Sequence, residues 1–205
     1  MAFITLEGIE GCGKSTQAPQ LCAWLGERAL LTCEPGGTRL GRDIRTLLLE
    51  PSRGAMSEVT EALLYLADRA QHVSEVIRPA LESGCMVVSD RYVDSTLAYQ
   101  GYGRGLPLDL LRAVARLATG GLEPDLTLFL DVPVALGLQR VGRRGRTDRL
   151  ESERLEFHER VRQGYMALIA EGGPRWMVVD GEGTQEEVAF RLREAVRCSG
   201  LVAPA

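Results

Sequence analysis

Hydrophobic residues in this chain form five short runs. Between these runs lie longer segments in which an apolar residue recurs every three or four positions. A run of four or five apolar residues with polar ends is typical of a buried strand, whereas the longer repeat is typical of a helix. Strands and helices therefore alternate, which predicts a parallel sheet covered on both faces, with ligands bound beyond the carboxyl ends of its strands. The expected strands are Phe3–Leu6, Leu30–Cys33, Met86–Ser89, Leu126–Leu130 and Trp176–Val179.

Helices are expected between these strands, and the longest carries a continuous apolar stripe. The stripe comprises Val59, Leu63, Leu66, Ala70, Val73, Ile77 and Leu81. Gly101–Gly105 is interpreted as a loop, and Thr184–Glu187 as a capping box before the last helix. The expected helices span about 15–28, 40–50, 57–82, 107–119, 133–140, 153–170 and the segment after 184. We expect residues 1–205 to form a single α/β/α domain with a mobile lid at about 142–151.

Composition narrows the class of protein. The chain has 205 residues, of which 45% are hydrophobic, and its net charge of −4 argues against general binding to nucleic acid or a membrane surface. No apolar run approaches the roughly 20 residues that span a bilayer, and no signal peptide precedes the first strand. We therefore expect a cytoplasmic protein. The chain has five cysteines and no Cys-x-x-Cys pair, which argues against disulfides and a zinc site.

Lys14 is the only lysine in the chain, and it belongs to a full match to the phosphate-binding loop pattern GxxxxGK[ST] at Gly8–Ser15. A strand before the loop and a helix after it are the context that this pattern requires. The loop amides and the helix N-terminus should surround phosphate, Lys14 should bridge the β- and γ-phosphates, and Ser15 should ligate Mg²⁺. The expected ATP-binding residues are Gly8, Ile9, Glu10, Gly11, Cys12, Gly13, Lys14, Ser15 and Thr16.

A guanine-specific GTPase is excluded, because the chain contains no asparagine and so cannot form an Asn-Lys-x-Asp motif. Asp180–Gly183 matches the letters of a DxxG switch, but it follows the last strand, and we interpret it as a turn. The phosphate loop alone indicates a nucleoside triphosphate and does not indicate the reaction.

Further charged residues fall at positions where ligands bind. Asp90 and Arg91 follow a central strand, where a carboxylate can hold Mg²⁺ and an arginine can bind a second phosphate; a surface ion pair is the alternative. Tyr65 and Arg69 lie on the same helix face. Their spacing fits two interpretations equally well: a surface that binds a nucleotide base, or a tyrosine at the edge of the core with the arginine in solvent. Segment 142–149 carries four arginines, which indicates a catalytic lid rather than a solvated charge run.

Taken together, these motifs resemble the thymidylate kinase family from the first strand to the last helix. Besides the phosphate loop, the resemblance is carried by Glu34–Thr38, Leu64–Arg69, Asp90–Ser95, Ala98–Gly101 and Asp148–Glu151. The pieces Glu34–Thr38, Asp90–Ser95 and Tyr99–Gly101 are much more specific than the phosphate loop. The resemblance implies the P-loop nucleoside-triphosphate hydrolase fold, with five parallel strands between helical layers. It implies phosphoryl transfer from ATP to dTMP with Mg²⁺, and a homodimer.

Roles follow from the resemblance residue by residue. Glu10 helps to position metal and acceptor, Arg91 binds the dTMP phosphate, and lid arginines Arg149 and Arg143 act in catalysis because Gly11 stands where some relatives have arginine. Tyr65 stacks on thymine and Arg69 hydrogen-bonds to it, while Tyr99 lies under the sugar. The implied substrate-binding set is Pro35, Arg45, Tyr65, Arg69, Arg91, Ser95, Thr96, Tyr99 and Gln100, and the implied metal set is Ser15 and Asp90.

Two alternatives stay open at this point. The first is another nucleoside monophosphate kinase with a different base preference. The second is a regulatory protein that uses nucleotide as a switch, against which the arginine-rich segment and the missing guanine motif both count.

Overall fold

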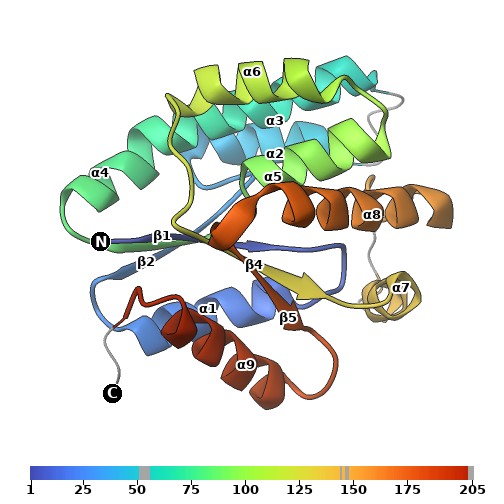
Figure 1. Cartoon of the computed structure of the whole chain (residues 1–205). Coiled ribbons are helices and arrows are strands. Elements are labelled where there is room, and N and C mark those ends of the chain that lie inside the picture. Colours follow the sequence, from blue (N-terminus) through green and yellow to red (C-terminus); the bar gives the residue numbers. More distant parts are fainter. Residues whose placement is uncertain (51–55, 144, 146–147, 203–205) are drawn as a thin grey trace.

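The computed structural model describes residues 1–50, 56–143, 145 and 148–202, and in this part of the chain five parallel strands form one sheet (Figure 1). The strand order is β2-β3-β1-β4-β5, so β1 lies at the centre of the sheet. All five predicted strands are confirmed to within one residue at each end. They are β1 Phe3–Glu7, β2 Ala29–Cys33, β3 Met86–Asp90, β4 Leu126–Asp131 and β5 Trp176–Asp180.

Helices cover both faces of the sheet, as the alternating pattern predicts. Helices α1 and α9 lie together on one face, and α2, α3, α6 and α8 lie on the other (Figure 1). The expected helices are confirmed. The helices are α1 Lys14–Leu25, α2 Arg39–Leu49, α3 Glu58–His72, α4 Arg78–Glu82, α5 Val93–Thr96, α6 Leu108–Thr119, α7 Val134–Gly142, α8 Leu155–Glu171 and α9 Gln185–Cys198, with π-helical turns at Val73–Ile77 and Leu97–Gly103 and a 3₁₀ turn at Gly173–Arg175.

The strands form the centre of the hydrophobic core. Every residue of β1 is buried, and so are residues 126–130 of β4. This is the pattern of parallel strands that helices cover on both faces. None of the helices in the described part of the chain combines the length and apolar character that crossing a bilayer requires.

The apolar stripe predicted on the long helix is only partly buried. Leu66, Val73 and Ile77 lie in the core, but Val59 and Leu63 at the start of α3 are 56% and 54% exposed. The first two residues of the stripe therefore lie outside the core that the described residues form.

The prediction of a loop at Gly101–Gly105 is also wrong for its first part, since Leu97–Gly103 is π-helical. These glycines allow close packing rather than a turn. A Cβ atom on Gly101 would lie 2.4 Å from Leu108 Cδ2, and one on Gly103 would lie 2.7 Å from Phe157 Cε2. Only Gly105, with φ of 83°, has the backbone of a turn glycine.

Parallel pairing brings the carboxyl ends of the central strands to one edge of the sheet. Leu6 pairs with Asp90, and Glu7 pairs with Phe129. The segments after β1, β3 and β4 consequently leave the sheet side by side, where the ligand site of this class of fold is expected.

Candidate functional site

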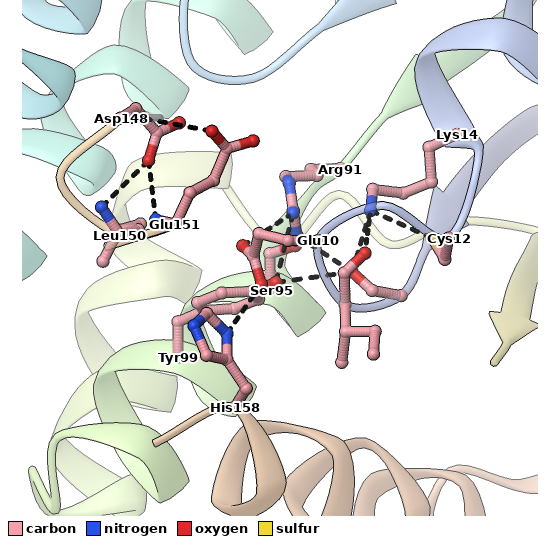
Figure 2. Close-up of polar contacts among 12 residues, drawn as sticks. Glu10, Cys12, Lys14, Arg91, Ser95, Tyr99, Asp148, Leu150, Glu151 and His158 are labelled. Atoms are coloured by element: carbon pink, nitrogen blue, oxygen red, sulfur yellow. Dashed lines mark hydrogen bonds and ion pairs between the residues drawn. The ribbon is translucent and has the colours of Figure 1, made fainter. Parts of the chain in front are cut away.

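The glycine-rich loop connects β1 to α1 in a conformation that ordinary residues rarely adopt. Gly8, Gly11 and Gly13 have φ values of 147°, 70° and 108°. Lys14 is buried, and its Nζ donates to the carbonyl oxygens of Gly8 and Ile9, both at 2.9 Å, above the loop (Figure 2). The ammonium group and the N-terminus of α1 therefore face the same space, which favours an anion there.

A cavity of about 1050 Å³ opens in front of this loop. Its walls come from the loop, the turn after β2, helices α1, α2 and α3, the ends of β3 and α7, and the segments before α8 and α9. Among the predicted site residues, the cavity is lined by Glu10, Gly11, Cys12, Gly13, Lys14, Ser15, Thr16, Pro35, Arg45, Tyr65, Arg69, Asp90, Arg91, Ser95, Thr96, Tyr99 and Gln100.

Arg91 lies next to the loop with its backbone in the left-handed region, at φ of 78°. Its Nη1 donates to Gly8 O at 3.2 Å and to Ser95 Oγ at 3.0 Å. Its Nη2 donates to Tyr99 Oη at 3.1 Å and pairs with Glu10 at 3.3 Å. Lys14 and Arg91 thus share the Gly8 carbonyl, which places two cations side by side at the wall of the cavity.

Glu10 is a buried carboxylate held between Arg91 and His158 (Figure 2). Its second oxygen lies 3.2 Å from His158 Nδ1 on α8. Burial would raise the pKa of Glu10, but the His158 hydrogen bond and the charges of Arg91 and Lys14 outweigh it and lower this pKa to about 2. Glu10 is therefore ionised at neutral pH and fixes Arg91 electrostatically.

Arg69 is 1% exposed and is held by three acceptors. It donates from Nε to Glu34 at 2.8 Å, from Nη1 to Thr96 Oγ1 at 2.8 Å and from Nη2 to the Tyr92 carbonyl at 2.8 Å. A guanidinium has five N–H donors, so two hydrogens are left after these three bonds. Tyr65, one turn earlier on α3, lines the cavity beside Arg69.

The lid arginine Arg149 does not line the cavity in this structure. Its Nε donates to Leu48 O at 2.9 Å, and its Nη2 lies 2.5 Å from the buried carboxylate of Glu61 on α3. Glu61 also accepts from Arg104 and from the amide of Gln100. Burial would raise the pKa of Glu61, but the bonds from Arg104 and Gln100 lower it.

The other lid arginines are less informative. Arg143 is exposed at the end of α7 and does not line the cavity. Three residues of the predicted lid, Arg144, Arg146 and Thr147, lie outside the described residues. On the cavity side, the lid segment contributes Asp148, Leu150 and Glu151.

Sequence analysis missed two residues of this site. Arg140, on the last turn of α7, lines the cavity and donates to Gly11 O at 3.4 Å and Gly181 O at 3.2 Å. His158 is buried, and its Nδ1 lies 3.2 Å from Glu10 Oε2. Arg140 could have been found as a basic residue at a helix end after β4, whereas no local signal marks His158.

The residues expected to hold Mg²⁺ suit that ion. The Ser15 side chain is exposed and Asp90 is half-buried, and both line the cavity next to the phosphate loop. Within the described residues, no group of three or more His, Cys, Asp or Glu side chains could form a complete metal cage. Such a sparse donor set matches Mg²⁺, which takes one or two protein ligands together with phosphate oxygens and water.

Comparisons with known proteins agree with each other. The family model described as Thymidylate kinase matches residues 6–191. A thymidylate kinase of Desulfovibrio desulfuricans is 52% identical over 204 residues, which cover 95% of this chain and 94% of that relative. One of Carboxydothermus hydrogenoformans is 53% identical over 194 residues, covering 93% and 94%. The crystal structure of thymidylate kinase from Ehrlichia chaffeensis aligns with a TM-score of 0.77 at 30% identity, covering 96% of this chain and 97% of that one.

Proposed function

The chain belongs to the thymidylate kinase family, and we propose that its cavity holds the two substrates of that reaction end to end. The reaction transfers the γ-phosphoryl group of ATP to dTMP and gives dTDP and ADP. One observation supports placing the donor and the acceptor on opposite sides of the cavity. Lys14, on the donor loop, and Arg91, at the end of β3, donate to the same carbonyl of Gly8. A phosphoryl group in transfer would pass in front of this pair of cations.

We assign the donor half to residues 8–16. Backbone amides of Gly11, Gly13 and their neighbours bind the β-phosphate, and Lys14 spans the β- and γ-phosphates. Arg140 and the turn at Gly181–Gln185 line the cavity beyond this loop, on the side of α9. We place the adenine of ATP there, since a guanidinium stacks well on a planar base.

We assign the acceptor half to the opposite wall. Tyr65 stacks on thymine, and Arg69 uses its two remaining N–H groups toward the base. Arg91 binds the acceptor phosphate, and Tyr99 lies under the sugar. The remaining acceptor contacts of the proposal are Pro35, Arg45, Ser95, Thr96 and Gln100, all of which line the cavity.

Charge stabilisation is the main catalytic contribution in this arrangement. The acceptor phosphate is already anionic, so the reaction needs no strong general base. Lys14 and Arg91 neutralise charge on the transferred group, and Glu10 holds Arg91 in place through their ion pair. Mg²⁺ would be held by Ser15 and Asp90 with phosphate oxygens, and would supply further charge neutralisation when bound.

We propose that residues 1–205 act as one domain, and that the segment 142–151 closes over the bound nucleotides. Arg143 and Arg149 remain candidates for contact with phosphate. In the present structure Arg149 is bonded to Leu48 and Glu61, so the proposal requires it to exchange these partners when ATP binds. In this exchange Arg149 would lose its ion pair with Glu61 and gain one with a phosphate group.

We also propose a cytoplasmic homodimer. Four large apolar side chains are more than half exposed on two neighbouring helices: Val59 and Leu63 on α3, and Leu110 and Leu117 on α6. A second copy of the chain, packed through these helices, would remove them from water. The cytoplasm is where both nucleotide substrates are made and used.

A panel of monophosphates tests the proposed substrate. Purified enzyme with ATP and Mg²⁺ is assayed for ADP release with dTMP, dUMP, dCMP, dGMP and AMP. We expect dTMP to give the highest kcat/KM. A higher value with another monophosphate would support the kinase with a shifted base preference, and ADP release that needs no monophosphate would support the nucleotide switch instead.

A further inference from the structure

Behind the cavity, β1 ends in a fully buried carboxylate, Glu7, to which none of the roles above applies. Its Oε1 accepts from the backbone N–H of Tyr92 at 2.8 Å. Its Oε2 accepts from Ser95 Oγ at 2.6 Å and from Tyr165 Oη at 2.8 Å. A buried carboxylate is expensive unless it is fully hydrogen-bonded, so these three donors indicate a built arrangement rather than chance.

The first of these bonds fixes the backbone next to Arg91. Among the described residues, Arg91 is the only non-glycine residue with a positive φ, at 78°, a conformation that is strained for a residue with a side chain. The strained turn is held on both sides. Arg91 N donates to Leu6 O at 3.0 Å, Arg91 O accepts from Ser89 Oγ at 2.8 Å, and the next peptide, at Tyr92, donates to Glu7.

The second bond sets the direction of a hydroxyl that touches the Arg91 side chain. The Ser95 hydroxyl donates its single proton to Glu7 Oε2 at 2.6 Å. The lone pairs of Ser95 Oγ are then free to accept from Arg91 Nη1 at 3.0 Å. Glu7 therefore acts on Arg91 twice, through the backbone at Tyr92 and through the Ser95 hydroxyl, without entering the cavity.

We propose that Glu7 is a positioning residue for acceptor binding: it holds the strained Arg91 turn and orients Ser95 so that the guanidinium of Arg91 stays in the cavity wall. The inference rests on the proposed role of Arg91 as the ligand of the acceptor phosphate. It extends that role to a residue on the central strand that contacts neither substrate.

The test is the Glu7→Gln variant, which keeps the shape of the side chain but supplies an amide N–H₂ where only an acceptor fits. If its amide faces the Tyr92 N–H, that bond is lost. If its amide faces Ser95, the hydroxyl must turn and accept from it, which reorients the oxygen that accepts from Arg91. We expect KM for dTMP, and Kd for dTMP measured by calorimetry, to rise about tenfold, the effect of losing one charge-assisted hydrogen bond. KM for ATP should change by less than about twofold, because Glu7 itself bonds to no residue of the donor loop and reaches it only through Arg91.

Thr127→Val is the matched control. Thr127 is a buried polar residue on the neighbouring strand β4, and its hydrogen bonds go to Thr5 and Arg175. It should lower the melting temperature and leave both KM values unchanged. A Glu7→Gln variant that behaves in the same way would show a structural role alone and overturn the inference.

A double-mutant cycle with Arg91→Ala separates this inference from the proposed function. If Arg91→Ala leaves KM for dTMP unchanged, the assignment of Arg91 itself fails. If Arg91→Ala raises KM for dTMP, Glu7→Gln should add little in that background, because Glu7 acts through Arg91. Full additivity would overturn the positioning role while leaving Arg91 as the phosphate ligand.

Should Glu7→Gln fail to fold, Glu7→Asp answers the same question. It keeps the charge but is one methylene shorter, so it cannot reach Tyr92 and Ser95 together. A selective rise in KM for dTMP supports the inference, and unchanged values for both substrates overturn it.

Discussion

Gly11 in the phosphate loop and Gly137 in α7 touch backbone to backbone. A Cβ atom on Gly11 would lie 2.0 Å from Gly137 O, and a Cβ atom on Gly137 would lie 2.4 Å from Glu10 O. The loop and the first turn of α7 can approach this closely only because both positions are glycine. The contact also explains why an arginine side chain at position 11 does not fit this chain as it is folded here.

Gly11→Ala and Gly13→Ala form a matched pair that tests this contact. Both positions have a positive φ, but a Cβ on Gly13 meets nothing within 4 Å. We expect Gly11→Ala to destabilise the protein by at least about 1 kcal/mol more than Gly13→Ala, because it adds a backbone collision to the conformational strain. Urea unfolding of the two variants measures the difference, and equal losses would show that only the backbone conformation matters.

Lys14→Ala should reduce kcat by at least about 100-fold, the effect of removing one preorganised charge from a transferring group. The melting temperature should change little by comparison, because Lys14 bonds only to its own loop, at Gly8, Ile9 and Cys12. A coupled assay for ADP gives kcat. A variant with near-normal turnover would refute the catalytic role assigned to this ammonium.

Glu61→Gln should be strongly destabilising. Glu61 is 1% exposed and pairs with Arg104 and Arg149, so its loss leaves Arg149 without its carboxylate and Arg104 with Glu153 as its remaining one. Breaking a buried pair in this way costs roughly 3–5 kcal/mol. The control is Glu171→Gln, which removes the partner of Arg112 in an exposed pair and should cost under about 1 kcal/mol. Similar losses in both variants would contradict the importance of burial.

Asp68 should make stability depend on pH. Burial, and then the charge of Glu34, raise the pKa of Asp68 from 3.8 to about 6, against the opposing effects of the Gly36 N–H bond, His72 and Arg69. In the folded state the acid therefore keeps its proton to higher pH than in the unfolded chain. The contribution of Asp68 to stability is full below about pH 4 and falls as pH rises to about 6.

Asp68→Asn removes this titration while keeping the shape of the side chain. We expect the free energy of unfolding of the variant, relative to the unmodified protein, to increase by on the order of 2 kcal/mol between pH 4 and pH 8. Urea denaturation of both proteins at several pH values measures the change. Curves that stay parallel across this range would show that Asp68 titrates normally.

Leu63→Arg tests the proposed dimer. A charge placed on the exposed apolar face of α3 should separate the subunits, because it cannot be buried between them without a partner. Leu155→Arg, at an exposed apolar position on α8, is the control and should leave the association unchanged. Sedimentation equilibrium reports the mass of each variant. A monomeric unmodified protein, or a Leu63→Arg variant that still dimerises, would contradict the proposal.

The sequence predicted the strands and the phosphate loop because both depend on local pattern. The five buried apolar runs and the Gly8–Ser15 motif can each be recognised without knowledge of distant residues. The same local reasoning failed at Gly101 and Gly103, where the glycines permit packing against Leu108 and Phe157 rather than a turn. The identity of those neighbours is a property of the tertiary fold.

Arg149 illustrates a second limit of sequence analysis. Its place in an arginine-rich segment predicts a group that faces phosphate. In the structure it contacts Leu48 and Glu61, which lie 101 and 88 residues earlier in the chain. Likewise, nothing in the sequence around His158 indicates that it contacts Glu10. Contacts between distant elements decide which of several arginines or histidines reaches the cavity.

The single lysine has a practical consequence for anyone who works with this protein. Lys14 holds the only lysine amine in residues 1–205, and it is 5% exposed at the floor of the nucleotide cavity. An amine-reactive dye therefore has a single lysine to attack among these residues. The rate at which Lys14 is labelled would report directly on whether the donor position is empty or filled.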